Sequence, residues 1–99
     1  MHNVENFSSE THRIELEGEY DLSRLEELRE ALAHIDGNGP VILDLRSVDY
    51  ADSTFLHELG RLKTKYPDCP MIVYGASSRM KKLLSLVDFD KLFTISEPE

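Results

Sequence analysis

Short apolar runs alternate along this chain with stretches of helical periodicity, and this alternation constrains the fold more than any other feature. The runs 41–45 and 71–74 are short and nearly all apolar, which is typical of strands buried inside a sheet. Around them, apolar residues recur at spacings of three and four, as on one face of a helix. Because buried strands that alternate with amphipathic helices form largely parallel sheets, the chain is expected to have an α/β fold.

Helix boundaries are marked by capping residues and by proline. Ser23 and Glu26 have the spacing of a capping box, which predicts that the first helix begins there. The glycine and proline residues of the turn 37–40 are expected to end it. The second helix contains the apolar positions of segment 55–62 and ends at 66–67, because the residue before a proline avoids helical geometry.

The strands and the third helix follow from the same pattern. Strands are expected at 4–8, 13–17, 41–45, 71–74 and 91–95, with 4–8 as an edge strand paired with 13–17. A third helix, with apolar positions between 80 and 87, follows a cap at Ser77 or Ser78. These elements predict one domain over residues 1–99: a small mixed, largely parallel sheet of about four or five strands with amphipathic helices packed against it.

Composition excludes several classes of protein. A chain of 99 residues with a net charge of −8 repels phosphate backbones, so a nucleic-acid binder is not expected. Apolar runs stay well below the roughly 20 residues of a membrane helix, and the polar N-terminus does not predict a signal peptide. Cys69 is the only cysteine, which suits a reducing cytoplasm. The four histidines lack metal-ligand spacing, so neither a metal nor a cofactor is expected.

The charge is distributed unevenly. Residues 1–30 contain nine acids and three bases, so this segment carries most of the negative charge. Other bases gather in two clusters, Arg61/Lys63/Lys65 and Arg79/Lys81/Lys82. The acidic segment is either an ordinary solvated face or a docking surface for a basic partner.

The segment after the run 41–45 is the most informative for function. A short polar loop is expected there, followed by Asp52, Ser53 and Thr54 just before the second helix. Functional groups of parallel α/β folds gather at the carboxyl ends of strands. Asp52 or Ser53 can be simply the N-cap of that helix. Alternatively, a hydroxyl at this helix N-terminus is a phosphoacceptor, because the free amides and the helix dipole favour a phosphate there.

Three motifs in sequence order resemble those of STAS domains of the anti-sigma factor antagonist type. Gly18-Glu19-Tyr20-Asp21 follows a strand, Ala51-Asp52-Ser53-Thr54 follows the next strand, and Ala76-Ser77-Ser78-Arg79-Met80 precedes the third helix. The resemblance covers roughly residues 13–95. It implies a protein-interaction module in the cytoplasm rather than an enzyme.

In that family the serine directly after the motif aspartate is phosphorylated, and this position is Ser53 here, with Thr54 as the second candidate. The resemblance implies that an anti-sigma factor serine kinase adds the phosphate and that a serine phosphatase removes it. The unphosphorylated protein binds the kinase and so releases a sigma factor. The residues expected to flank this docking surface are Glu19, Asp21, Asp52, Thr54 and Phe55.

One position departs from the family pattern: Phe55 stands where glycine usually follows the two hydroxyl residues. This substitution keeps two other functions open, a non-phosphorylated subunit or regulator of a membrane lipid or anion transport complex, and a scaffold module in a signalling complex. A hydrolase built on Ser53 and His57 is the least favoured class, because no Gly-x-Ser-x-Gly elbow surrounds the serine.

Overall fold

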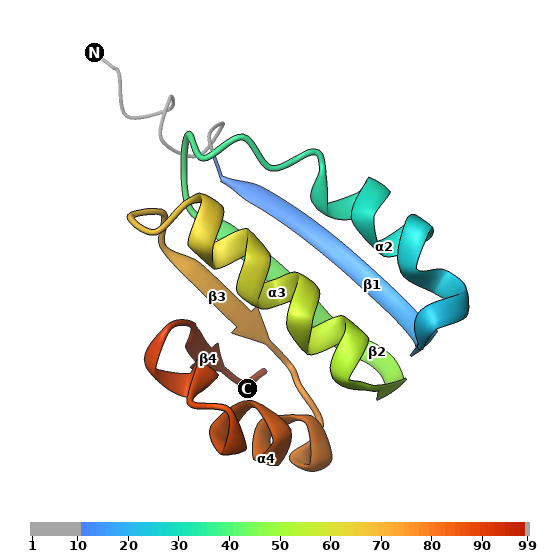
Figure 1. The fold of residues 1–99 in the computed structure, drawn as a ribbon. Helices are drawn as coiled ribbons and strands as arrows, with labels where there is room; N and C mark the ends of the chain where they lie inside the picture. Colours follow the sequence, from blue (N-terminus) through green and yellow to red (C-terminus); the bar gives the residue numbers. More distant parts are fainter. Residues whose placement is uncertain (1–10, 99) are drawn as a thin grey trace.

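The computed structural model describes residues 11–98, which form one four-stranded sheet and three α-helices (Figure 1). The strands pair in parallel throughout and lie in the order β1 (His12–Tyr20), β2 (Val41–Ala51), β3 (Met71–Tyr74) and β4 (Thr94–Ser96). The connections contain the 3₁₀ helices η1 (Leu22–Arg24) and η2 (Phe89–Lys91) and the α-helices α2 (Leu25–Leu32), α3 (Ser53–Lys65) and α4 (Ser78–Leu86). The predicted α/β fold with a small, largely parallel sheet is confirmed.

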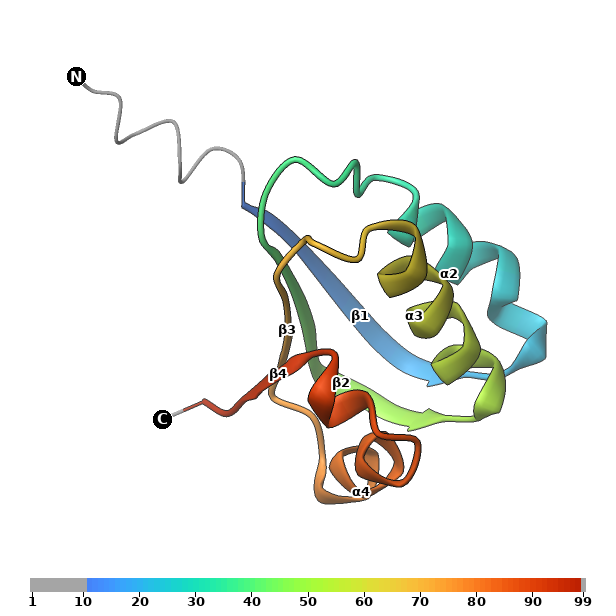
Figure 2. The same cartoon turned by 60° about the vertical axis from the view of Figure 1, so that its left-hand side comes forward.

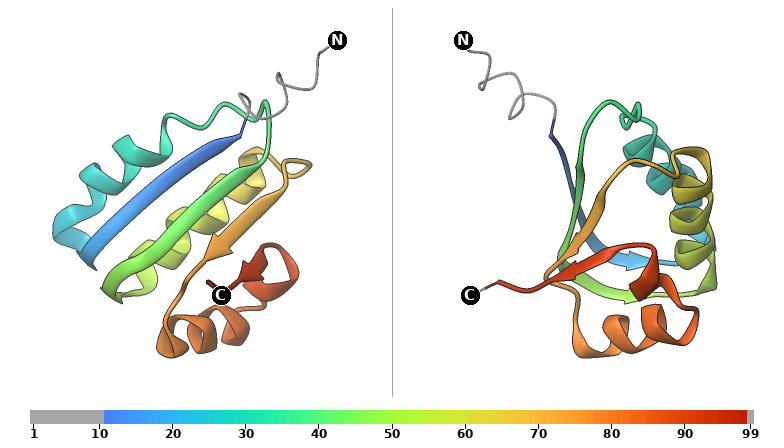
Figure 3. Two further views of the ribbon diagram at one scale, coloured as in Figure 1. Left: turned by 180° about the vertical axis from the view of Figure 1, so that it is seen from behind. Right: turned by 90° about the vertical axis from the view of Figure 1, so that its left-hand side faces the viewer.

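The α-helices lie on one side of the sheet (Figures 2 and 3). Crossovers between parallel strands have the same hand, and these strands follow one another in sequence order, so each helix returns over the same face. Within residues 11–98, no helix or strand covers the opposite face. We call this second side the open face.

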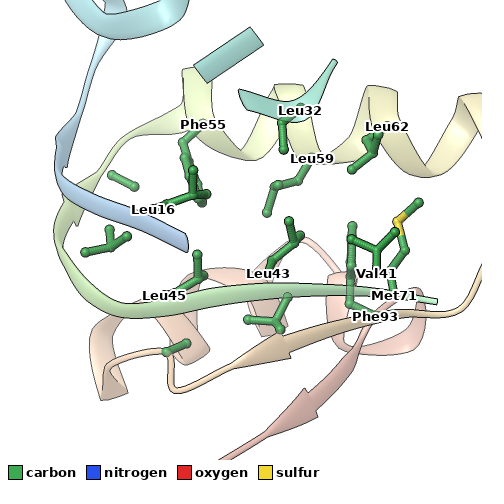
Figure 4. Packing of buried hydrophobic residues seen from close by; sticks show 14 of the residues in the cluster. Leu16, Leu32, Val41, Leu43, Leu45, Phe55, Leu59, Leu62, Met71 and Phe93 are labelled. Carbon is green, nitrogen blue, oxygen red and sulfur yellow. The ribbon is translucent and has the colours of Figure 1, made fainter. Parts of the chain in front are cut away.

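The hydrophobic core fills the space between the sheet and the helices (Figure 4). Alternate residues of β2 and β3 point into it, and the apolar stripe of α3 covers them. The largest side chains that are fully buried are Phe55, Leu28, Leu43, Leu45, Leu59, Met71, Leu84, Val41 and Val73. The helical spacing therefore predicted the buried positions Leu28, Leu59 and Leu84 correctly, whereas Val87, expected on the apolar face of the third helix, is 44% exposed because α4 ends at Leu86.

Strand β2 is six residues longer than predicted, and this prediction was wrong at the segment expected to be a polar loop. Residues 46–51 continue the strand and pair with β1. Two register shifts place an extra residue on β2, between Glu15 and Glu17 and again between Gly18 and Glu19 of β1. These bulges interrupt the alternation of buried and exposed side chains, so the sequence pattern resembles a loop.

Strands β1 and β2 extend beyond the rest of the sheet. β3 pairs with β2 only over residues 41–44, whereas β1 pairs with β2 as far as Ala51. The last part of β1 and β2 is therefore a two-stranded arm, which Figure 1 shows reaching past the end of β3. The arm carries the chain into η1 at one tip and into α3 at the other.

Some other boundaries agree with the predictions, but β1 begins one residue before the expected strand 13–17 and continues three residues past it, through Gly18 to Tyr20. β3 and the end of α3 before Pro67 are confirmed, and Ser77 caps α4 through a hydrogen bond from the amide of Met80. The first helix differs at both ends, because α2 begins at Leu25 after η1 and ends at Leu32, well before the turn 37–40. The last strand begins at Thr94, since η2 occupies the start of the expected segment. The expected strand 4–8 lies outside the described residues.

The open face contains a buried carboxylate, that of Asp44, which is 3% exposed. Arg13 Nη2 donates to its Oδ2 at 2.6 Å, and Arg46 Nη2 donates to the same oxygen at 2.7 Å. Hydrogen bonds from Arg46 are the main cause that lowers the pKa of Asp44 to about 2. Both guanidinium groups also lie over the ring of Tyr74, at 5.6 Å and 5.1 Å from its centroid.

Candidate functional site

The candidate site lies where the carboxyl ends of β1 and β2 meet. Tyr20 pairs with Ala51 in the parallel register, and the amide of Asp52 donates to the carbonyl of Tyr20 at 3.2 Å. Asp21 and Ser53 each follow one of these paired ends. The expectation that the two motifs converge in space agrees with this geometry.

Asp52 fixes the start of α3. Its backbone is extended, and its Oδ1 accepts a hydrogen bond from the amide of Thr54 at 2.9 Å. Ser53 is therefore the first helical residue, and its side chain is exposed, whereas Thr54 is half-buried. Of the two candidate N-caps, Asp52 has this role. Ser53 presents the more accessible of the two hydroxyl groups.

Asp21 has a similar role at the start of η1. Its Oδ1 accepts hydrogen bonds from the amide and the hydroxyl of Ser23, at 2.9 Å and 2.5 Å, and these bonds lower the pKa of Asp21. The predicted capping box of Ser23 and Glu26 is wrong, because Ser23 lies inside η1 and α2 begins after Arg24 without a side-chain cap. An acidic cap thus stands at each tip of the arm.

Arg24 holds the end of β1 in place, which the sequence did not reveal. Its Nη1 donates to the carbonyls of Glu17 and Glu19 at 2.8 Å and 3.1 Å, and its guanidinium lies 4.2 Å from the ring centroid of Tyr20. Gly18 makes this approach possible, since its φ is +84° and a Cβ there would lie 2.9 Å from Nη1 of Arg24. The glycine of the first motif therefore has a steric role in positioning Glu19 and Asp21.

Phe55 does not lie on the surface. Its side chain is 0% exposed, and its ring centroid lies 5.4 Å from that of Tyr20 in the core. The expectation that Phe55 flanks the docking surface is corrected, because the side chain offers no accessible atoms to a partner. Its position instead attaches the first turn of α3 to the end of β1.

Two exposed apolar side chains at this end of the molecule were missed. Leu22 of η1 is 69% exposed and Tyr50 of β2 is 44% exposed. The only signal in the sequence was their position beside the two motifs, because the segment around Tyr50 resembled a loop. We call the surface formed by these residues and the polar ones the Ser53 corner: Glu19, Asp21, Leu22, Tyr50, Asp52, Ser53 and Thr54.

The chemistry of the Ser53 corner is that of an accessible hydroxyl among carboxylates. Ser53 stands at the N-terminal end of α3, where the helix dipole favours negative charge, while Glu19, Asp21 and Asp52 are already acidic. Within residues 11–98 there is no group of three His, Cys, Asp or Glu side chains that could hold a metal ion. None of the helices in the described part of the chain is long and apolar enough to cross a membrane.

Comparison with known families gives one match over nearly the whole chain. A family model described as "Mlab, STAS domain" matches residues 4–95. No curated protein matches the chain.

Solved structures share the fold at low sequence identity. The STAS domain of a SulP transporter from Vibrio cholerae is 22% identical with a TM-score of 0.67, and the alignment covers 90% of this chain and 73% of that one. A sulfate transporter family protein from Wolinella succinogenes is 20% identical with a TM-score of 0.70, covering 87% and 75%. The anti-sigma factor antagonist SpoIIAA in its unphosphorylated form is 22% identical with a TM-score of 0.60, covering 91% and 80%.

Proposed function

This chain belongs to the STAS domain family, and from that membership we propose that it is an interaction module whose binding is controlled by phosphorylation of Ser53. In this proposal it is an anti-sigma factor antagonist. Unphosphorylated, it binds an anti-sigma factor serine kinase and so releases a sigma factor. Phosphorylation ends the complex, and a serine phosphatase restores it. The protein acts in the cytoplasm as a substrate and binding partner, not as an enzyme.

The observation that carries the proposal is the placement of Ser53. Its exposed side chain is the first of α3, directly after the Asp52 cap and beside the end of β1. The hydrogen bond that caps α3 runs from the Thr54 amide to Asp52, so it does not use the Ser53 hydroxyl. A kinase can therefore reach the oxygen, and adding a phosphoryl group does not remove that cap.

Phosphoryl transfer would change the surface rather than the fold. The Ser53 oxygen forms a bond to the γ-phosphorus of ATP, the bond to ADP breaks, and the hydroxyl proton leaves to a base supplied by the kinase. The product adds about −1.5 to −2 charges at pH 7. The helix N-terminus favours that charge locally, whereas Asp52 beside it and any acidic group of a partner repel it.

The docking surface in this proposal is the Ser53 corner. The exposed apolar side chains of Leu22 and Tyr50 supply contact area, and Glu19, Asp21 and Asp52 supply negative charge. Such a surface fits a partner that presents basic and apolar groups together. Binding is then sensitive to extra negative charge at Ser53, because the phosphate stands among the contacts.

A second candidate function is regulation of a lipid or anion transport complex without phosphorylation. The likeness to two proteins whose names refer to transporters favours it. In this case the Ser53 corner contacts a transport subunit, such as an ATPase, and Ser53 is a contact residue. A partner identified by affinity capture as a transport ATPase rather than an anti-sigma kinase would favour this candidate.

Mass spectrometry of the protein purified from its own host tests the primary proposal. We expect a single phosphate on the peptide that contains Ser53, its loss in Ser53→Ala, and its retention in the neighbouring control Thr54→Ala. In binding assays with the kinase, Ser53→Ala should bind and Ser53→Asp should bind at least about 10-fold more weakly. Equal binding by Ser53→Ala and Ser53→Asp would contradict the proposal.

A further inference from the structure

The exposed side of α3 carries a row of basic and polar side chains. His57, Arg61 and Lys65 are spaced by four residues, which places them on one face of the helix. The only acid in α3 is Glu58, which is 6% exposed. We call this row the α3 ridge. Figure 1 shows α3 running between α2 on one side and the α4–η2 segment on the other.

A hollow of about 370 Å³ lies between the ridge and α2. Leu32 and Leu62 contribute apolar surface to it, and Arg29 lines its α2 side. Arg29 Nε lies 3.3 Å from one oxygen of Glu58, and Arg61 Nη1 lies 3.5 Å from the other. The one carboxylate in the hollow is thus shared by two guanidinium groups, so positive charge remains in excess.

A second hollow of about 490 Å³ lies on the other side of the ridge. Phe89 and Leu92 contribute its apolar surface, and Leu92 is 47% exposed. Phe89 lies close against the helix because position 60 is glycine: a Cβ there would be 3.1 Å from Cζ of Phe89. Arg61 and Lys65 line both hollows, so each apolar surface is bordered by the same cations.

We propose that the α3 ridge and its two hollows bind an acidic amphipathic segment of a partner protein. Apolar side chains of the segment occupy the hollows, and its carboxylates lie along Arg61 and Lys65. Charge complementarity supports this occupant, because Arg61 and Lys65 line both hollows whereas the only acid of α3, Glu58, is buried and already paired with Arg29 and Arg61. A basic segment would meet like charge along the ridge.

The acidic helix of a second copy of this chain does not fit the surface, so a second copy would have to present its Ser53 corner, and self-association is therefore one outcome of the test below. That acidic helix is α2, with Glu26, Glu27 and Glu30 exposed. The apolar face of that helix, which includes Leu28 and Leu32, is buried in its own core. A second copy could therefore present α2 carboxylates to the ridge but no α2 leucines to the hollows.

The ridge is separate from the Ser53 corner, so this inference does not rest on phosphorylation. The two cations that the segment would contact, Arg61 and Lys65, follow Ser53 by eight and twelve residues, rises of about 12 Å and about 18 Å along the axis. These distances are about one and a half and two times the screening length of roughly 8 Å at physiological salt. Binding at the C-terminal half of α3 should therefore continue whether or not Ser53 carries a phosphate.

The test uses two synthetic helical peptides with the same leucine face, one flanked by glutamates and the other by glutamines. Titration into ¹⁵N-labelled full-length protein should shift amides of Gly60, Thr64 and Leu92 with the glutamate peptide. The variant Arg61→Gln/Lys65→Gln should bind it about tenfold more weakly. The matched control, Arg79→Gln/Lys82→Gln, removes two exposed cations from α4 and should bind within about twofold of wild type.

Several results would overturn the inference. Equal binding of the glutamine and glutamate peptides would exclude the ridge as an acidic docking site, and so would amide shifts that centre on the Ser53 corner. Self-association of the protein that Arg61→Gln/Lys65→Gln abolishes would assign the surface to a second copy instead. If the double variant misfolds, Lys65→Gln alone replaces it, because Lys65 is not paired with Glu58.

Discussion

The two ends of α3 differ in the sign of their charge and in whether that charge can change. The N-terminal end stands at the Ser53 corner among Glu19, Asp21 and Asp52, and the C-terminal half carries Arg61 and Lys65. Both arrangements complement the helix dipole, which favours acids near the start and bases near the end. The difference is that the first end also contains an exposed hydroxyl, whose modification adds charge.

This contrast shows how one helix can serve two surfaces. A phosphate at Ser53 would alter only the first end, because solvent screens its charge before the second. One apolar stripe holds both ends of α3 in place, because its residues Phe55 and Leu59 are fully buried against the sheet. The first prediction below tests the packing of this apolar stripe, the second tests the open face of the sheet, and the third tests whether the two ends of α3 act independently.

The largest effect is expected for Phe55→Ala. The side chain is fully buried and packs beside Tyr20, so its removal should lower the free energy of unfolding by about 3–5 kcal/mol, as measured by urea denaturation. His57→Ala, on the exposed side of the same helix, should change it by no more than about 0.5 kcal/mol. A loss below about 1 kcal/mol in Phe55→Ala would show that Phe55 does not hold the first turn of α3.

A smaller loss of stability is expected on acidification, and it arises at Asp44 on the open face rather than at either end of α3. The pKa of Asp44 is about 2 in the folded protein against 3.8 as its ordinary value, so its stabilising contribution is complete above pH 3.8 and disappears as the pH falls toward 2. We expect a loss of about 1–2 kcal/mol across this window, after allowance for the half-exposed arginines.

Urea denaturation at several pH values checks this expectation. Asp44→Asn should remove that part of the pH dependence, whereas Glu30→Gln, at an exposed position of α2, should leave it unchanged. An Asp44→Asn protein with the same slope between pH 4 and pH 2 as wild type would assign the acid sensitivity to other groups.

The smallest effect is expected at the ridge when the corner is modified. Ser53→Asp should leave the affinity for the glutamate peptide within about twofold of wild type, because the new charge lies about one and a half screening lengths from Arg61 and about two from Lys65. The same variant should weaken binding of a partner at the Ser53 corner. Isothermal titration of both ligands measures the two effects side by side. A loss at the ridge comparable to that at the corner would show that the ends are coupled.

Local signals in the sequence were enough to locate β3, α3 and α4. Pro67 ends α3, Ser77 caps α4, and the apolar run of β3 is bounded on both sides by residues that interrupt it. Asp52 was one of two predicted caps, and Ser53 follows it as the first helical residue. These features depend on neighbours within a few residues, so a single sequence contains them.

The arm and its surroundings depend on contacts between distant residues, and the sequence did not reveal them. The extra residues on β2 become bulges only when paired with β1, so segment 46–51 resembled a loop. Arg24 acts on carbonyls five and seven residues earlier in the chain, which no helical spacing indicates. The exposure of Leu22 and the burial of Phe55 were decided by the direction of η1 and by packing against Tyr20.

The two-stranded arm carries the Ser53 corner at its tip. The arm begins at the four-stranded part of the sheet, and its tip is held by the hydrogen bonds of Arg24 to the end of β1 and by the packing of Phe55 beneath α3. The two bulges lie along the arm, and because bulges bend a strand and increase its twist, they set the direction in which the tip points. Gly18 admits Arg24 and Phe55 packs against Tyr20, so a substitution at either position would change where the corner lies as well as how tightly it is packed.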